Sequence, residues 1–299
     1  MSKSSFPSID LSVIEPICLP QNKLGHQLFI LREDLIHPII SGNKWRKLKY
    51  VFEHVKAHQF DGIISYGGAY SNHLVACAAA AKLHNISCML RVRGEELTPN
   101  SNDYLSFCKN QGAELEFISR SDFQDVKHTY GPMEINGKSY FSIPEGGAHA
   151  LGFKGCLEIV NQAMDYDFIA LAQGTTTTSL GVLLSSSQDS EVWVFPVLKG
   201  FDTIQEMEAL AKTFDCELEW ERNKHRLRVF STYHFSGYGK GGYEVENALN
   251  KLHVKTHFDL DKVYTMKAFV GLLTELNQLD NSLKGLFIHT GGVFSQGLF

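Results

Sequence analysis

The chain has 299 residues, a formal net charge of -5, 43% hydrophobic residues and 20% charged residues. This length suits one large domain or two closely associated domains, and the apolar content supplies a sizeable core. The mild acidic balance, with no long basic run, argues against nucleic acid or an anionic membrane as a partner.

The predicted elements alternate between short apolar runs and helices. An apolar run at 28–31 precedes a helix over 44–59, where Leu48, Val51, Phe52 and Val55 recur at helical spacing. Further strands are predicted at 62–65, 87–92, 114–118, 140–143, 168–172, 191–196 and 286–289. Further helices are predicted at 71–83, 100–110, 152–164 and 203–214, with a short one ending at 184.

This alternation indicates the fold class. Strands that alternate with helices, and that are apolar on both faces, are typical of a parallel sheet in an α/β fold. Such sheets bind ligands in the loops at the carboxyl ends of their strands. Glycine-rich turns follow at least four of the predicted strands, so these turns are the candidate sites.

The cysteines and histidines give no sign of a disulfide framework or a metal site. The six cysteines form no CxxC pair, and Cys77 and Cys88 lie in apolar stretches, so buried free thiols in a reducing cytoplasm are expected. His149, His234 and His289 show no metal-binding spacing. The N-terminus lacks the apolar core of a signal peptide, and no apolar stretch could span a bilayer, which predicts a cytoplasmic protein.

The stretch Ser41-Gly42-Asn43-Lys44 places a lysine in the first turn of a predicted helix. Asn43 or Ser41 is the expected N-cap, and Gly42 is a permissive turn residue. The helix dipole disfavours a cation there and lowers the pKa of the Lys44 amine. A neutral amine can form a Schiff base, whereas the alternative is a solvated lysine in a basic cluster.

Two other turns open helices with polar groups. Gly174-Thr175-Thr176-Thr177-Thr178 combines helical N–H groups with hydroxyls, which is typical of a phosphate cradle, although a threonine-rich cap is the alternative. Ser71-Asn72-His73 offers groups that hold a carboxylate or a phenolic oxygen, with an ordinary capping turn as the alternative. No P-loop lysine lies near the threonine loop, no GxGxxG follows the first strand, and there is no GxSxG elbow.

Five motifs, taken together and in order, resemble one enzyme family. They are Ser41-Gly42-Asn43-Lys44-x-Arg46-Lys47-Leu48, Tyr70-Ser71-Asn72-His73, Ile143-Pro144-Glu145-Gly146-Gly147-x-x-Ala150-Leu151-Gly152, Val263-Tyr264-Thr265-x-Lys267 and His289-Thr290-Gly291-Gly292. The family is the pyridoxal-phosphate (PLP) enzymes of the 1-aminocyclopropane-1-carboxylate (ACC) deaminase and D-cysteine desulfhydrase group, with the tryptophan synthase β-like fold (fold type II). The resemblance runs from about residue 29 to residue 292.

The resemblance implies a two-lobed α/β fold with mostly parallel sheets flanked by helices. Residues 1–51 and 142–299 would form the large PLP-binding domain, and residues 52–141 would form the small domain. The cofactor would lie in the cleft between them. A homodimer that acts on a small amino acid is also implied.

The resemblance also implies a role for each site residue. Lys44 would form the Schiff base with PLP, Asn72 would bind its phenolic oxygen, and Thr290 would face its pyridine nitrogen. The phosphate would be held by Gly174, Thr175, Thr176, Thr177 and Thr178. The substrate carboxylate would be held by Ser71, Asn72 and His73, with Tyr264 beside the ring. Lys44, assisted by Ser71 or Tyr264, would carry out proton transfer.

Some positions separate the branches of the family or depart from it. The ACC deaminase branch carries a glutamate directly after the tyrosine and a leucine in the late HxGG, where this chain has Thr265 and Thr290. Both favour the D-cysteine desulfhydrase branch, whereas Met266 departs from the glycine expected there. Thr176 and Thr177 replace the usual glycines of the phosphate loop, which requires a tighter cradle or a path with only negative φ angles.

The expected reaction is therefore β-elimination of D-cysteine to pyruvate, sulfide and ammonia. The alternative within the family is ACC deamination, which gives 2-oxobutyrate and ammonia. Outside it, the alternatives are a non-catalytic PLP-binding or phosphate-ligand-binding protein that keeps the fold, or a sugar-phosphate or nucleotide site at 174–178 without PLP.

Overall fold

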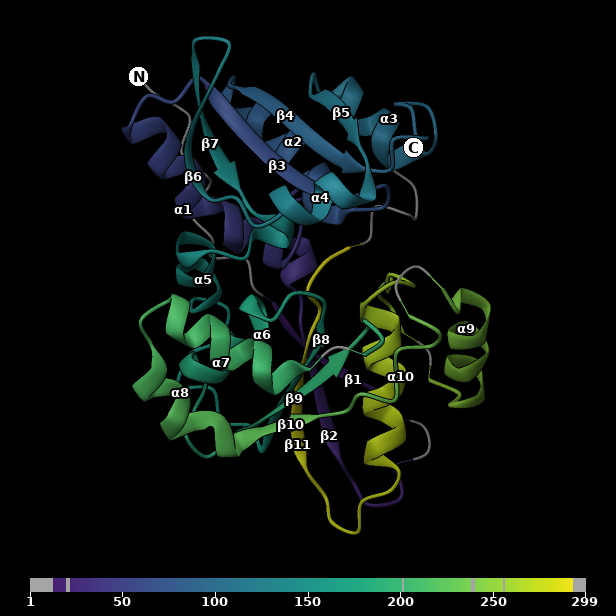
Figure 1. The fold of residues 1–299 in the computed structure, drawn as a ribbon. Helices are drawn as coiled ribbons and strands as arrows, with labels where there is room; N and C mark the ends of the chain where they lie inside the picture. Colours follow the sequence, from purple (N-terminus) through teal and green to yellow (C-terminus); the bar gives the residue numbers. More distant parts are fainter. Residues whose placement is uncertain (1–12, 20–21, 201, 238–239, 255, 293–299) are drawn as a thin grey trace.

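The computed structural model describes residues 13–19, 22–200, 202–237, 240–254 and 256–292. The chain forms two lobes that meet at a narrow waist, and each lobe is built around one sheet (Figure 1). Within the described residues, no helix is both long and apolar enough to cross a membrane.

The upper lobe in Figure 1 contains a five-stranded sheet. Its strand order is β5 (Glu114–Ile118), β4 (Ser87–Arg93), β3 (Gly62–Gly68), β7 (Lys138–Ile143) and β6 (Gly131–Ile135), and only the β6–β7 pair is antiparallel. One face packs against α1 (Asn43–Ala57), α2 (Asn72–His84) and α3 (Asp103–Asn110). The other face packs against α4 (Arg120–Val126).

The lower lobe contains a six-stranded sheet with the order β1 (Ile14–Ile17), β2 (Gln27–Leu31), β11 (Lys284–Ile288), β8 (Phe168–Gln173), β9 (Glu191–Pro196) and β10 (Leu227–Val229). Only the β1–β2 pair is antiparallel. One face packs against α5 (Ala150–Cys156), α6 (Thr177–Ser185), α7 (Thr203–Thr213) and α8 (Glu217–Asn223). The other face packs against α9 (Gly242–Lys251) and α10 (Thr265–Leu276). Short 3-10 turns lie at Glu33–Leu35, Glu145–Gly147 and Lys224–Arg226.

The sequence explains why the inner elements form. Every residue of β8 is buried, because helices cover both faces of its sheet. Its sequence, FIALAQ, accordingly contains no charged residue. Helix α2 is alanine-rich and buried along most of its length, and Ser71 caps its first turn. The predicted α/β fold with two mostly parallel sheets is therefore confirmed.

Some predicted details were wrong. The helix predicted over 152–164 ends at Cys156, since the amides of Glu158 and Ile159 bond the carbonyls three residues back and the chain continues as turns. In the β6–β7 hairpin, only residues 140–143 of β7 were predicted as a strand, and β6 was not predicted. The predicted domain boundaries fall inside α1 and β7, and the division into two domains stays a prediction.

Candidate active site

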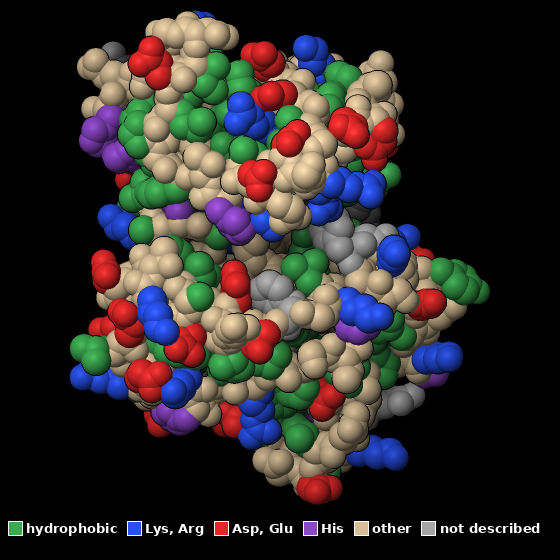
Figure 2. Space-filling model, in the orientation of Figure 1, with side chains coloured by type: hydrophobic (Ala, Val, Ile, Leu, Met, Phe, Trp, Pro, Cys, Tyr) green, Lys and Arg blue, Asp and Glu red, His purple; other side chains and the backbone are tan. Residues whose placement is uncertain are grey.

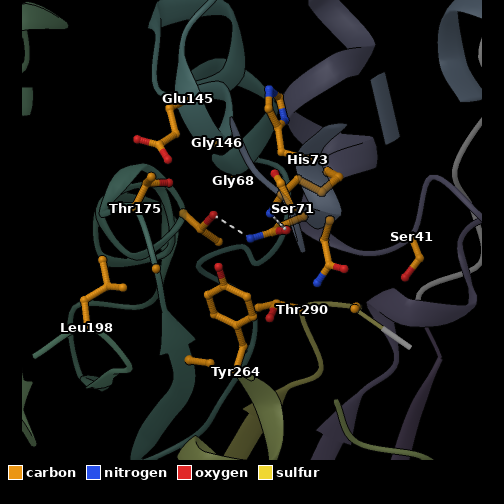
Figure 3. A pocket seen from close by; sticks show the side chains of 18 of the residues that line it. Ser41, Gly68, Ser71, His73, Glu145, Gly146, Thr175, Leu198, Tyr264 and Thr290 are labelled. Atoms are coloured by element: carbon orange, nitrogen blue, oxygen red, sulfur yellow. Dashed lines mark hydrogen bonds between the residues drawn. The ribbon is translucent and has the colours of Figure 1, made fainter. Parts of the chain in front are cut away.

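A pocket of about 330 Å³ lies between the lobes, where the carboxyl ends of the parallel strands of both sheets meet. We call it the interlobe pocket (Figure 3). It is lined by Ser41, Asn43, Lys44, Gly68, Ser71, Asn72, His73, Arg93, Lys127, Glu145, Gly146, Ala172, Gly174, Thr175, Thr178, Leu198, Tyr264, Thr290, Gly291 and Gly292. The structure thus brings most of the predicted site residues together, whereas Thr176 and Thr177 lie just behind the lining.

A glycine is required at the turn before α1. Gly42 has φ 62°, and a Cβ added there would lie 2.0 Å from the carbonyl oxygen of Thr290. Gly42 itself is the N-cap, so the predicted cap at Asn43 or Ser41 was wrong. Asn43 is instead the first residue of the helix, and its backbone N–H donates to the Thr290 carbonyl at 3.1 Å. This contact joins the start of α1 to the end of β11.

A buried ion pair braces the same turn. The Arg46 guanidinium donates to both carboxylate oxygens of Glu33, at 2.8 and 2.7 Å. The carbonyl of Glu33 accepts the N–H of Gly42 at 3.0 Å. Because a bidentate Arg–carboxylate pair fixes direction as well as distance, it holds the turn, and with it Lys44, in one position.

The Lys44 amine lies in the interlobe pocket. Its Nζ donates to Asn43 Oδ1 at 2.9 Å, and Asn43 Nδ2 donates to Thr178 Oγ1 at 3.0 Å, which links the amine to the threonine loop. Burial, together with the nearby charge of Lys47, lowers the pKa of Lys44 to about 7. The lowered pKa agrees with the sequence prediction, but burial is its main cause, not the helix dipole.

Lys47 is a second buried amine, one helical turn from Lys44. Its side chain is 1% exposed, and its Nζ donates to the Gly146 carbonyl at 2.9 Å and to Thr175 Oγ1 at 3.0 Å. The described residues supply no ion-pair partner for it. Burial lowers its pKa as well. A buried amine therefore lies directly behind the threonine loop.

The turn before α2 places its three polar residues differently. Ser71 is the N-cap, and its Oγ accepts the N–H of Leu74 at 3.3 Å. Asn72 lines the pocket, and its buried Oδ1 has no hydrogen-bond partner among the described residues. The His73 ring is buried and bonds Ser65 Oγ through Nε2 at 2.9 Å, and Figure 3 shows it pointing away from Tyr264. Burial holds its pKa well below the ordinary value, so the ring is neutral.

The threonine loop lies between β8 and α6. None of its residues has a positive φ angle, so the loop needs no glycine at Thr176 or Thr177. Thr176 is the N-cap of α6, yet no side chain caps that helix. The buried hydroxyls of Thr176 and Thr177 have no partner among the described residues. Gly174 is needed for close approach, because a Cβ there would lie 2.8 Å from the Tyr264 ring.

Tyr264 and Thr290 complete the pocket from the lower lobe. The Tyr264 hydroxyl points into the pocket in Figure 3. The Asp261 carboxylate accepts the N–H groups of Tyr264 and Thr265, each at 2.9 Å, and this fixes the start of α10. The hydroxyl of Thr265 donates to the same carboxylate at 2.9 Å, so Thr265 is buried and does not line the pocket.

Sequence reasoning missed several polar residues of the site. Asn43 was interpreted only as a cap, and Lys47 only as part of a motif, although both contact the threonine loop. Arg93, Lys127 and Glu145 also line the pocket. Glu145 lay in one of the five motifs. Arg93 directly follows a predicted strand, so the rule that ligands bind at the carboxyl ends of parallel strands could have identified it.

No group of histidine, cysteine and acidic residues suited to a metal ion occurs among the described residues. All six cysteines are free thiols, of which five are buried, including Cys77 and Cys88 as predicted. Cys18 is exposed, so the expectation of buried thiols was wrong at that position.

Comparison with known proteins places this pocket in a family. A Pyrococcus furiosus protein named "Putative 1-aminocyclopropane-1-carboxylate deaminase" is 32% identical over 97% of this chain and 93% of its own length. A D-cysteine desulfhydrase from Klebsiella pneumoniae is 27% identical over 96% of this chain and 94% of its own. A crystal structure of an ACC deaminase homologue matches with a TM-score of 0.75 and 25% identity, over 94% of this chain and 89% of that one.

No protein-family model matches the chain. The relatives nevertheless match almost end to end, and the solved structure shares the fold over most of both chains. The chain belongs to the family of PLP-dependent lyases and deaminases that contains ACC deaminase and D-cysteine desulfhydrase.

Proposed function

We propose that this enzyme binds PLP in the interlobe pocket and removes sulfide from D-cysteine by β-elimination. The observation that carries the proposal is the Lys44 amine. It lies in a pocket bordered by the N-termini of α2 and α6, and burial lowers its pKa to about 7. A substantial fraction of this amine is therefore the neutral nucleophile at physiological pH.

The residues present fit the cofactor. The uncapped start of α6 offers N–H groups to a phosphate, and the unpartnered hydroxyls of Thr176 and Thr177 lie in the same turn. The Lys47 amine donates to Thr175 Oγ1 from behind the loop and holds that hydroxyl in place. Asn72, with an unpartnered amide oxygen, lies on the wall formed by α2, where a phenolic oxygen would find its amide N–H. Thr290 would face the ring nitrogen.

When bound, PLP withdraws electrons from the α-carbon of the amino acid. The chain's own residues orient the substrate and move its protons. The neutral Lys44 amine takes the α-proton, and the hydroxyls of Ser71 and Tyr264 assist. As the C–S bond breaks, its electron pair leaves with sulfur as hydrosulfide. The remaining 2-aminoacrylate is hydrolysed by water to pyruvate and ammonia, so D-cysteine and water give pyruvate, sulfide and ammonia.

The start of α10 supports D-cysteine as the substrate. Thr265 occupies the position after Tyr264, and its hydroxyl is held by Asp261, so this residue brings no carboxylate into the pocket. Deamination of ACC to 2-oxobutyrate and ammonia is the second candidate. It is favoured by the Pyrococcus relative, whose name states that activity.

The visible absorption spectrum of the purified protein tests the proposal before and after D-cysteine is added. We expect a cofactor band that changes while pyruvate and sulfide appear, and we expect ACC to yield no 2-oxobutyrate. A band unmoved by D-cysteine but altered by ACC would replace the first candidate with the second. No band after incubation with excess PLP would overturn both candidates, and a non-catalytic ligand-binding function would then replace them.

We also propose that the enzyme is a homodimer, as the family resemblance implies. Light scattering coupled to size-exclusion chromatography gives the mass directly, against 33.5 kDa for one chain. A mass of one chain at micromolar concentration would refute the dimer.

A further inference from the structure

The upper rim of the interlobe pocket carries two basic side chains that the proposed reaction does not use. They are Arg93, the last residue of β4, and Lys127, the residue that follows α4. Within the described residues, neither forms an ion pair. Figure 2 shows Lys and Arg side chains along the edge of the upper lobe beside the waist.

Arg93 lies beside the turn proposed to hold the substrate. It pairs in register with Gly68 at the carboxyl end of β3, and the Gly68 carbonyl accepts the N–H of Ser71 at 3.1 Å. One guanidinium nitrogen would lie 3.4 Å from a Cβ built on Gly68. The guanidinium also lies 5.6 Å from the centre of the Phe123 ring, a cation–π distance that limits where it can turn.

Lys127 approaches the pocket from the same lobe. Its backbone carbonyl accepts the N–H of Glu145 at 2.8 Å, which fixes this part of the chain next to the rim. Glu145 is the one acidic residue in the described lining. Figure 3 shows its carboxylate on the side of Thr175, away from Ser41. Glu145 forms no ion pair with either basic residue among the described ones.

The charges of the other ligand groups are already matched elsewhere. The cofactor phosphate would have the start of α6 and Lys47, and the α-carboxylate would have the start of α2 with Ser71. Arg93 and Lys127 therefore bring two positive charges to a lining whose one described acidic residue is Glu145, which leaves a positive charge in excess of what a neutral amino acid needs. An arginine and a lysine with free donors at a pocket rim are suited to an anionic group.

We propose that Arg93 and Lys127 select amino acids that carry a negative charge on the β-carbon, such as a carboxylate, a sulfinate, a phosphate ester or a thiolate. This inference rests on the proposed PLP site and extends it to a class of substrates. It includes D-cysteine as its thiolate, and it excludes ACC, whose ring carries no charge. The two basic residues are specificity residues and take no part in proton transfer.

Equilibrium binding of aspartate and asparagine tests the proposal, because the two ligands have nearly the same shape and differ in charge. The PLP-loaded enzyme is titrated with both enantiomers of each by calorimetry. We expect at least one enantiomer of aspartate to bind about tenfold or more tightly than the same enantiomer of asparagine. Equal binding, tighter asparagine binding, or no binding of either ligand would overturn the proposal.

Substitutions at the rim test which residues cause the preference for aspartate over asparagine. Arg93→Gln and Lys127→Gln should each reduce the aspartate-to-asparagine ratio at least threefold and leave asparagine binding unchanged. Arg91→Gln is the matched control, because Arg91 is on the same strand, is paired with Glu116 at 2.7 Å, and does not line the pocket. Glu145→Gln should raise the ratio. If Arg93→Gln weakens both ligands equally, the arginine holds the α-carboxylate and the proposal fails.

This test is separate from that of the proposed function. The binding ratio is read without turnover, so a failure to release sulfide from D-cysteine would refute that substrate and leave the ratio interpretable. A normal sulfide yield with a ratio of one would refute only the selection by charge.

Discussion

Two helix N-termini border the interlobe pocket, and they are built in opposite ways. Helix α2 starts with Ser71, whose hydroxyl accepts a backbone N–H of its own first turn. Helix α6 starts with Thr176, has no side-chain cap, and buries two hydroxyls without a partner among the described residues. Both follow parallel strands, at β3 and β8, so the difference comes from the turn residues.

The difference teaches which ligand each end is suited to hold. Buried polar groups without partners are costly, so the start of α6 is incomplete until an anion occupies it. At the start of α2, the Ser71 hydroxyl satisfies one N–H of the first turn, although the buried Asn72 amide oxygen beside it has no partner among the described residues. We infer that the α6 end holds the cofactor phosphate, which stays, and that Ser71 at the α2 end holds the substrate, which is exchanged, next to Asn72 on the phenolic oxygen of the cofactor.

The largest expected effect comes from Lys44→Ala, which separates covalent attachment of the cofactor to Lys44 from binding of its phosphate at α6. Lys44→Ala should lower turnover of the substrate by about a thousandfold or more, because it removes the neutral amine that moves the α-proton. The α6 end is unchanged, so PLP should still bind, with the spectrum of the unattached aldehyde. Spectra and pyruvate release measure the two effects. Unchanged turnover would remove Lys44 from the mechanism.

The next prediction concerns the α6 end alone. Thr178→Val should weaken PLP binding by roughly 10- to 100-fold, the range expected for a hydrogen bond to a charged group. It also removes the contact from Asn43 to Thr178. Binding of pyridoxal, which has no phosphate, should change much less. Thr274→Val, whose hydroxyl bonds a carbonyl within α10, is the control. Equal weakening of both cofactor forms would move the phosphate away from α6.

Ser71→Ala changes the α2 end instead. It should lower kcat/KM by roughly tenfold or more and leave the affinity for PLP unchanged, since the hydroxyl serves the substrate. It should also reduce the free energy of unfolding by about 1 kcal/mol, as expected for a lost N-cap. Steady-state kinetics and denaturant unfolding give the two numbers. A weaker PLP affinity with normal turnover would reverse the assignment of the two ends.

The pH dependence of cofactor capture reports on the amine between the two ends. Burial lowers the pKa of Lys44 to about 7, so the neutral fraction rises with pH and nears completion above about pH 8. The rate at which cofactor-free protein captures PLP should rise about tenfold from pH 6 to pH 8 and then level off. N-α-acetyl-lysine, measured in parallel, corrects for the cofactor's own titration. A rate that keeps rising to pH 10 would mean an ordinary lysine.

Local sequence patterns were enough to predict the loops but not the contacts between them. The strands before Ser71 and Thr175 are buried runs rich in apolar residues, and each is followed by turn residues, so the fold and the two helix starts could be predicted. The bond from Lys47 to Thr175 joins residues 128 positions apart, and the Gly42 turn fits only because the Thr290 carbonyl is beside it. Such pairings depend on how the two lobes pack, which periodicity does not encode.

The smallest expected effect tests the comparison most directly. The buried Thr177 hydroxyl has no partner among the described residues. In Thr177→Val a methyl group replaces this unsatisfied polar atom. The unfolding free energy of the cofactor-free variant should therefore stay within about 0.5 kcal/mol of the wild-type value, or rise above it. With PLP bound, the variant should gain less stability from the cofactor than the wild-type protein, which has threonine at this position. Thermal unfolding with and without PLP measures both values. A large loss of stability in the cofactor-free protein would show that this hydroxyl is satisfied within the chain, and the contrast between α2 and α6 would then disappear.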